Sequence, residues 1–249
     1  MSKLLQVTEL AAHCVNISKI IDDLRQRIQN NNFNADSNLT LTQYRASQRF
    51  SYIDNETISY VSHIAYNDPG QTTTNYSGLT EITFYLNDIP KLLPIDFISS
   101  QITDVIVNGY NVGDVSNGEF LLIPRVYLNI GYNNIAVNYV STFNNDGEGC
   151  MFYSDSTVAP PQNYTYTHFE PWSAHRFIPC FDQPDLKATA SFNVILPTEW
   201  NAVGNTGYSY MGAYNEADYI AKVPSQNEDL LVGKYLVNKS GNFYVFNKT

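Results

Sequence analysis

The first regular pattern along the chain is a seam of apolar residues at alternating spacings of three and four. Its members are Val7, Leu10, Cys14, Ile17, Ile21, Leu24 and Ile28. This period is typical of an amphipathic helix or of a short coiled-coil seam, and Asp22, Asp23 and Arg25 fall off the seam, as a solvated face requires. We therefore predict a helix over residues 2–29. We favour packing of this helix on a neighbouring surface over pairing with its own copy.

The residues after this seam are polar and then ambiguous. Residues 30–38 carry almost no apolar side chain and are predicted to be a linker. The segment that follows, to about residue 53, fits either a short helix or the run into a first strand. We thus expect two parts: residues 1–38, which form the N-terminal helix and linker, and residues 39–249, which form one folded domain.

From about residue 58 the pattern changes to strands separated by turns. Residues 81–86 alternate apolar and polar positions, and so do residues 134–140 and 190–196. Residues 102–107 are rich in β-branched side chains, and the Asn108-Gly109 pair after them is a strong signal for a hairpin. Such spacing predicts an all-β domain, a saddle-like antiparallel or mixed β-sandwich, preceded by one N-terminal amphipathic helix.

Charge and composition then narrow the class of protein. The formal net charge is −10 with no cluster of Lys or Arg, which argues against nucleic acid as a partner. No apolar run approaches a membrane span, and the N-terminus lacks the apolar core of a signal peptide, so a cytoplasmic protein is expected. Three cysteines in a chain of this length do not make a disulfide framework.

Residues 164–188 concentrate most of the reactive side chains, and two kinds of site can be tested against them. His168-x-Glu170 before Pro179-Cys180 is similar to part of a zinc deaminase signature, but position 183 is Gln where that signature needs a second Cys. No His in the chain begins the zinc motif His-Glu-x-x-His. We therefore expect no metal ligands in this chain.

A cysteine nucleophile is the second possibility. His175 precedes Cys180 by five residues, a spacing that does not bring the two side chains together in a strand or loop. The apolar neighbours Phe177, Ile178 and Phe181 would raise the pKa of the thiol. A buried structural cysteine is the favoured interpretation.

The same segment resembles a known family. The stretch Phe169-Glu-Pro-x-x-Ala-His-Arg-x-x-Pro-Cys-Phe-Asp-Gln-Pro-Asp-Leu-Lys-Ala188 is similar to the N-terminal domain of zinc aminopeptidases of the aminopeptidase N and leukotriene hydrolase type. Gly147-Glu-Gly149 upstream and Gly204-Asn205 downstream fit the same family. Looser similarity reaches back to about residue 58, and residues 1–40 fall outside it.

The resemblance implies a β-sheet saddle that packs on a catalytic domain and carries a Gln-x-Glu-Pro motif. In that family the Glu helps to hold the free α-amino group of the peptide. The Glu position is Glu170 here, and the Gln position is His168, which departs from the family pattern. His168 and Glu170 are therefore the candidate substrate-binding residues, and no catalytic residue is expected in this chain.

The family's zinc-binding motif and its other catalytic parts lie after this domain, so the resemblance implies that zinc and the catalytic domain are missing from this chain. The chain alone is then expected to be inactive and to need a catalytic domain in cis or in trans. The alternative is a non-catalytic binding or scaffold module that keeps the fold.

Arg176 and Asp182 are predicted to form an ion pair or to anchor the loop, and Gln183-Pro184 is a candidate tight turn that could be cis.

Overall fold

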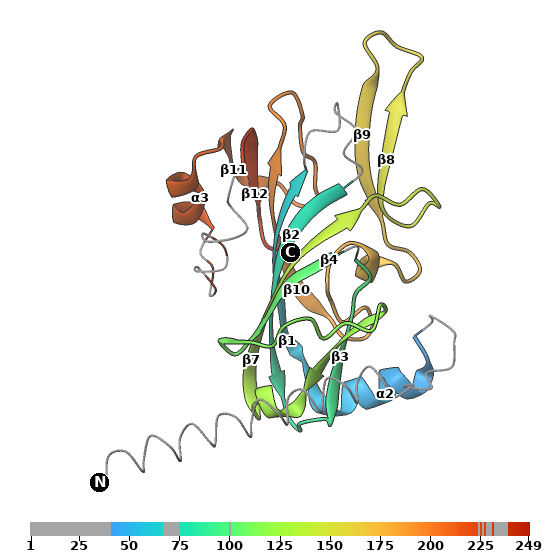
Figure 1. Cartoon of the computed structure of the whole chain (residues 1–249), viewed down its shortest axis with the longest axis vertical. Helices are drawn as coiled ribbons and strands as arrows, with labels where there is room; N and C mark the ends of the chain where they lie inside the picture. The colour runs from blue at the N-terminus through green and yellow to red at the C-terminus, as the bar shows by residue number, and fades with distance from the viewer. Residues whose placement is uncertain are drawn as a thin grey trace, which may run out of the picture. The chain divides into compact units, whose positions relative to one another are not determined.

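The computed structural model describes residues 41–66, 75–99, 101–223, 225, 227, 231 and 239–249 (Figure 1). The predicted helix over residues 2–29 lies outside these residues. The strands are β1 Ile53–Tyr66, β2 Asn75–Leu86, β3 Leu92–Asp96, β4 Gln101–Val107, β5 Tyr110–Asn111, β6 Phe120–Pro124, β7 Gly131–Thr142, β8 Gly149–Asp155, β9 Gln162–His168, β10 Ala188–Leu196, β11 Tyr208–Ala213 and β12 Asn242–Phe246. The helices are α2 Gln43–Tyr52 and α3 Glu216–Lys222, with short 3-10 helices η2 Arg125–Tyr127 and η3 Ala174–Arg176.

Most strands join one large mixed sheet. Its eight strands run in the order β11-β12-β10-β1-β2-β7-β4-β5. The pairing of β1 with β10 is parallel, and the other neighbours are antiparallel. Two further sheets have two strands each, β3–β6 and β8–β9. The prediction of an all-β domain with a mixed sheet is therefore confirmed.

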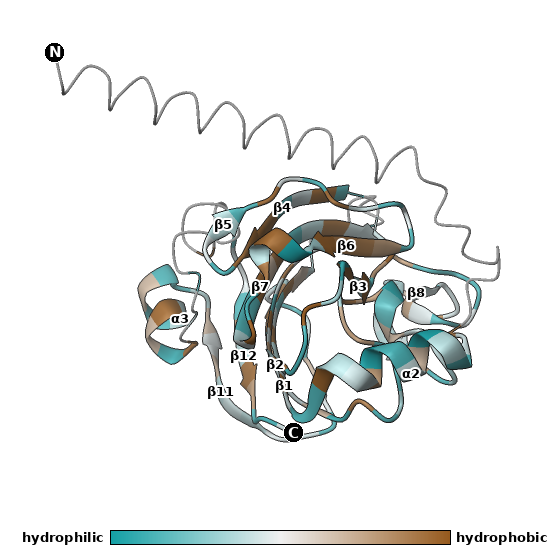
Figure 2. Cartoon of the chain, turned by 90° about the horizontal axis from the view of Figure 1, so that it is seen from below, coloured by the Kyte–Doolittle hydropathy of each residue, from teal (hydrophilic) through white to brown (hydrophobic). Residues whose placement is uncertain are grey.

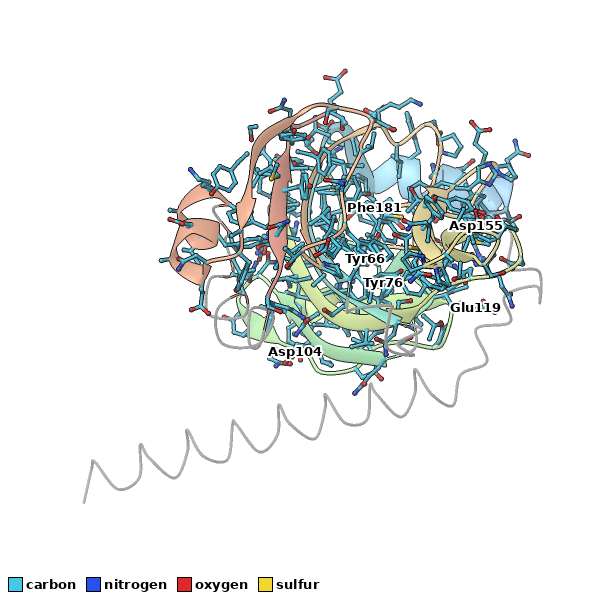
Figure 3. All side chains as sticks on the ribbon, turned by 90° about the horizontal axis from the view of Figure 1, so that it is seen from above. Tyr66, Tyr76, Asp104, Glu119, Asp155 and Phe181 are labelled. Atoms are coloured by element: carbon cyan, nitrogen blue, oxygen red, sulfur yellow. The ribbon has the colours of Figure 1, made fainter. Side chains whose placement is uncertain are left out.

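The main core lies between the large sheet and the smaller elements on one of its faces. Ile82, Phe84 and Val137 of the large sheet pack with Leu93 of β3 and Leu121 of β6, all of them completely buried. The segment around Phe181 closes this core, and Figure 3 shows Phe181 among packed side chains in the interior. The arrangement is sandwich-like, because two layers of strands share one apolar interior.

The opposite face of the sheet has a second, smaller core. Leu79, Ala136 and Phe243 on the sheet pack with Tyr219 and Val223, which belong to α3 and the residue after it. Both faces of the central strands are thus covered. Figure 2 shows apolar colour on the strands and a mostly hydrophilic α2.

The ambiguous segment before the first strand is a helix, α2. Thr42 caps its N-terminus, since its Oγ1 accepts a hydrogen bond from the Arg45 N–H at 3.3 Å. Arg49 is the one buried residue of this helix, with its side chain only 1% exposed. A basic residue in the buried position explains why apolar periodicity did not reveal the helix.

The predicted strands over 81–86, 102–107, 134–140 and 190–196 are present. Asn108 and Gly109 both have positive φ, as the short hairpin between β4 and β5 requires, and this turn was predicted. In β10 the alternating side chains do not separate into one buried and one exposed face. Asn193 and Ile195 are buried, whereas Phe192 and Val194 are half-buried. A strand between two neighbours in a sheet covered on both faces has no fully solvated side.

Candidate functional site

The candidate site begins where β9 ends. Strand β9 pairs with β8 in a hairpin, and His168, its last residue, is paired with Gly149. Figure 1 shows this hairpin extending beyond the edge of the large sheet, and Figure 3 shows Asp155, near its far end, at the periphery. Both predicted substrate-binding residues, His168 and Glu170, are exposed, and they lie at the base of the hairpin.

In the turn after β9, Phe169 is half-buried and the next residue, Glu170, is exposed. The Phe169 ring stacks on Phe177 with centroids 5.7 Å apart. The Ser173 N–H donates to the Phe169 carbonyl at 2.9 Å and so closes the turn. The peptide bond between Glu170 and Pro171 is cis. Glu170 therefore lies on a turn that is held by the packing of Phe169 and by the hydrogen bond between Ser173 and Phe169.

His168 is fixed to a loop far from it in sequence. Its Nδ1 lies 3.0 Å from the carbonyl oxygen of Gly147. Gly147 has a φ of 94°, a conformation that side-chain-bearing residues rarely adopt. A glycine at position 147 thus has a local structural reason, because the Gly147 carbonyl contacts the His168 ring at the end of β9.

An acidic clamp holds the same loop against the turn. Arg176 donates to Asp146 at 2.7 Å, to Asn144 at 3.2 Å and to Glu148 at 3.3 Å. Ser173 Oγ donates to the Glu148 carboxylate at 2.7 Å. The hydrogen bond from Arg176 lowers the pKa of Asp146 below its ordinary value. This clamp joins the loop before β8 to the turn that carries the candidate site.

Arg176 and Asp182, predicted either to form an ion pair or to anchor the loop, do not pair with each other, and the structure has the second alternative. Asp182 instead accepts hydrogen bonds from the His175 backbone N–H at 3.0 Å and from His175 Nδ1 at 2.7 Å. Its carbonyl oxygen accepts from Trp172 Nε1 at 2.6 Å. A carboxylate placed to cap these N–H groups is not available to Arg176. Both residues are still anchors of the loop, each with other partners than predicted.

A buried ion pair ties this loop to α2 and β3. Arg49 donates to both oxygens of Asp96, at 2.6 and 2.9 Å, and the Asp182 N–H donates to Asp96 at 2.9 Å. Burial alone would lower the pKa of Arg49, but the attraction and hydrogen bonds of Asp96 outweigh it and leave that pKa above its ordinary value. The Gln183 side chain also donates to the carbonyl of Ala46 at 3.1 Å.

Cys180 is a structural residue in this loop. It is buried, and burial raises the pKa of its thiol well above the ordinary range. His175, the proposed activating base, has its Nδ1 on Asp182. The structural interpretation of Cys180 is confirmed.

Among the described residues the cis bonds precede Pro160 and Pro171, so the candidate cis bond at Gln183-Pro184 is wrong.

A groove of about 840 Å³ runs beside the site. One wall is β9, through Asn163 and Thr165, and its apolar floor includes Phe177, Phe192 and Val194. Phe169 also lines it, which places the groove next to the turn that carries the candidate carboxylate. The half-buried apolar residues of β10 thus face this groove.

No group of three or more His, Cys, Asp or Glu side chains within the described parts of the chain could hold a metal ion. The side chains that the structure describes therefore do not fit a zinc site. In the same part of the chain, no helix is long and apolar enough to cross a membrane.

The segment that carries the candidate site is similar to known proteins. Residues 116–219 match the family model of the Peptidase M1 N-terminal domain, and this range includes the β8–β9 hairpin, the turn and the clamp. Over these residues the chain is therefore similar to the N-terminal domain of M1 aminopeptidases. Aminopeptidase N of Streptomyces lividans is 29% identical over 133 residues, which are 53% of this chain and 15% of that protein.

Other relatives and solved structures extend this result. A probable M1 family aminopeptidase of Encephalitozoon cuniculi is 39% identical over 64 residues, 24% of this chain and 7% of that protein. An M1 zinc metallopeptidase from Deinococcus radiodurans, solved with a Tyr-Ser-Ala substrate, has a TM-score of 0.54 at 17% identity, over 78% of this chain and 39% of that one. A two-domain M1 zinc metallopeptidase bound to L-tryptophan gives the same values. This chain therefore spans less than half the length of each of these proteins.

The sequence predicted the similarity to this family, but it did not reveal the clamp. Arg176 is 28 residues from Glu148 and 30 residues from Asp146 along the chain. The available signal was an acidic residue on each side of Gly147, close in sequence to the hairpin that leads to Glu170.

Proposed function

We propose that residues 39–249 form the part of a zinc aminopeptidase that binds the substrate amino terminus. In this proposal Glu170 and His168 contact the free α-ammonium of a peptide. Zinc and the catalytic residues come from a catalytic domain, in cis or in trans. The observation that carries the proposal is the exposed Glu170 carboxylate on a turn that the packing of Phe169 and a hydrogen bond from Ser173 hold in place.

An exopeptidase has to recognise a charged chain end, and a fixed carboxylate suits that task. Hydrogen bonds between an ammonium and a carboxylate are charge-assisted and stronger than neutral ones. A turn that is already ordered loses little conformational entropy when it binds. Holding the amino terminus at a fixed place also sets which peptide bond reaches the reacting groups.

The local charge supports a cationic ligand. No Lys or Arg occurs in residues 126–175, whereas Asp146, Glu148, Asp155 and Glu170 all lie in that segment. Arg176 is shared between the first two of these carboxylates. A surface of this sign attracts ammonium groups and raises their local concentration.

The groove beside β9 supports a partner for this domain. Its floor includes the half-buried residues Phe192 and Val194, which alternate along β10. We propose that a catalytic domain covers this apolar surface. A non-catalytic binding module remains the second candidate, and binding of peptides through their amino termini separates it from the first.

The test is a titration of the isotopically labelled chain with Tyr-Ser-Ala and with the same peptide acetylated at its amino terminus. We expect amide shifts of residues 166–172 with the free peptide and much smaller shifts with the acetylated peptide. Glu170→Gln should remove the difference, whereas Glu56→Gln, at an exposed carboxylate on β1, should retain it. Equal shifts from both peptides would refute an amine-binding role for Glu170.

A further inference from the structure

The hydrogen bond of His168 decides which of its ring nitrogens carries the proton. Its Nδ1 lies 3.0 Å from the carbonyl oxygen of Gly147. A carbonyl oxygen only accepts hydrogen bonds, so Nδ1 must be the donor. A neutral imidazole has one N–H, and its other nitrogen is an acceptor. Neutral His168 therefore has its lone pair on Nε2.

The carbonyl that imposes this tautomer is itself held in place from both sides. The residues flanking Gly147, Asp146 and Glu148, are both bound by Arg176. Strand pairing sets Gly149 opposite His168. The Gly147 φ of 94° requires a residue without a side chain, so the orientation of this carbonyl depends on glycine. Because the Gly147 carbonyl is fixed in orientation, the neutral imidazole of His168 takes the tautomer that donates to it from Nδ1.

A primary ammonium has three donors and no acceptor, so it needs acceptors around it. The Nε2 lone pair of exposed His168 supplies one, and the Glu170 carboxylate, two residues further along, supplies others. A protonated imidazole has N–H donors at both nitrogens and a positive charge. It therefore offers no acceptor to an ammonium and repels it.

We propose that His168 is a specificity-determining residue that accepts a hydrogen bond from the substrate ammonium through Nε2, in the neutral tautomer set by Gly147. Amine binding is then lost when the imidazole takes up a proton. The inference rests on the proposed function of Glu170, and it adds a dependence on pH that an amide side chain at position 168 cannot give.

The charged groups around His168 come from three elements. Asp146 and Glu148 lie on the loop that carries Gly147, Arg176 lies on η3 and pairs with both, and Glu170 lies on the turn after β9. Carboxylates as a class titrate near pH 4 and arginine above pH 12. Histidine as a class changes charge between about pH 5 and pH 8. Among these groups only histidine belongs to a class that changes charge in this range, and η3 carries a second histidine, His175, whose Nδ1 lies 2.7 Å from Asp182.

The first test observes the tautomer directly, without any ligand. Long-range proton–nitrogen NMR of the labelled chain at pH 8 should show the His168 proton on Nδ1 and a bare Nε2, with His168→Gln identifying the signals. Gly147→Ala should shift the balance between the tautomers, because its carbonyl cannot keep this orientation. A proton found on Nε2 in the unaltered chain would overturn the inference, whatever Glu170 does.

The second test measures binding with a probe whose own charge is constant. Butylammonium, which like a lysine side chain titrates near pH 10.4, is titrated into the chain at pH 5.5 and pH 8. We expect binding about tenfold weaker at pH 5.5, the usual effect of one charge-assisted hydrogen bond. His168→Gln should bind equally at both pH values, because the amide oxygen accepts at either.

The outcomes separate the two proposals. Loss of binding at both pH values in Glu170→Gln, with the pH dependence abolished in His168→Gln, supports both. The same pH dependence in His168→Gln as in the unaltered chain overturns the role of His168 alone. An unaltered chain that binds no butylammonium at either pH overturns the proposed function and the inference together.

Discussion

The ion pair between Arg49 and Asp96 gives the sharpest prediction about stability. Both side chains are 1% exposed, and two hydrogen bonds of 2.6 and 2.9 Å join them. Removing one partner leaves the other charge buried without compensation. Such a loss costs about 3–5 kcal/mol, a large part of the roughly 5–15 kcal/mol that holds a domain folded. Arg49→Met should therefore lower the free energy of unfolding by about 3–5 kcal/mol.

The measurement is urea unfolding followed by tryptophan fluorescence. Trp172 donates to the carbonyl of Asp182, whose N–H binds Asp96, so its emission reports the loop that the ion pair anchors. Arg125→Met is the control at an exposed arginine on η2 and should change stability by less than about 0.5 kcal/mol.

Two further variants keep this prediction testable if Arg49→Met does not fold. Arg49→Lys retains the charge but cannot form two parallel hydrogen bonds, so we expect an intermediate loss. Adding Asp96→Asn to Arg49→Met removes the uncompensated charge and should recover part of the stability. A loss below about 1 kcal/mol in Arg49→Met would refute the reasoning, because the pair would then contribute no more than an exposed one.

Three other predictions follow from buried groups. Desolvation lowers the pKa of His63 to about 3, so the folded chain keeps this ring neutral while the unfolded chain protonates it below about pH 6.5. Stability should therefore fall by about 1.4 kcal/mol per pH unit on acidification from pH 6.5, and His63→Gln should flatten this slope in unfolding curves at several pH values. In a Cys14→Ser background, the buried thiols of Cys150 and Cys180, whose pKa values burial raises, should react with an aromatic disulfide reagent only in denaturant. Fast reaction of this variant in its native state would contradict their burial. Gly241→Ala should cost about 2 kcal/mol or more in the same urea assay, because its φ is 110° and an added Cβ would collide with the Leu196 carbonyl.

The strands could be predicted because their signals are local. The alternation over 81–86 and the Asn108-Gly109 turn depend on neighbouring residues, and the structure has both. The family motif placed Glu170 for the same reason, since it is continuous in sequence. Glu170 lies on an exposed turn two residues after the end of β9, and its contact with a substrate stays a prediction.

Long-range pairings could not be predicted in this way. Arg49 and Asp96 are 47 residues apart, and nothing in the sequence between them indicates that they meet. Asp182, six residues after Arg176, is not its partner, because that carboxylate caps His175. Partner choice among several carboxylates depends on how the hairpin folds back, which local patterns do not contain.

The parallel pairing of β1 with β10 has a consequence for how the chain folds during its synthesis. Ile58 pairs with Ala188, so 130 residues separate two strands that are neighbours at the centre of the sheet. Loop closure over such a distance is slow, and proteins with many non-local contacts fold slowly. The edge of β1 that pairs with β10 therefore stays unpaired until the ribosome has synthesised residue 196. Over that interval the nascent β1–β2 hairpin presents an open strand edge, the kind of surface that chaperones cover and that aggregates extend.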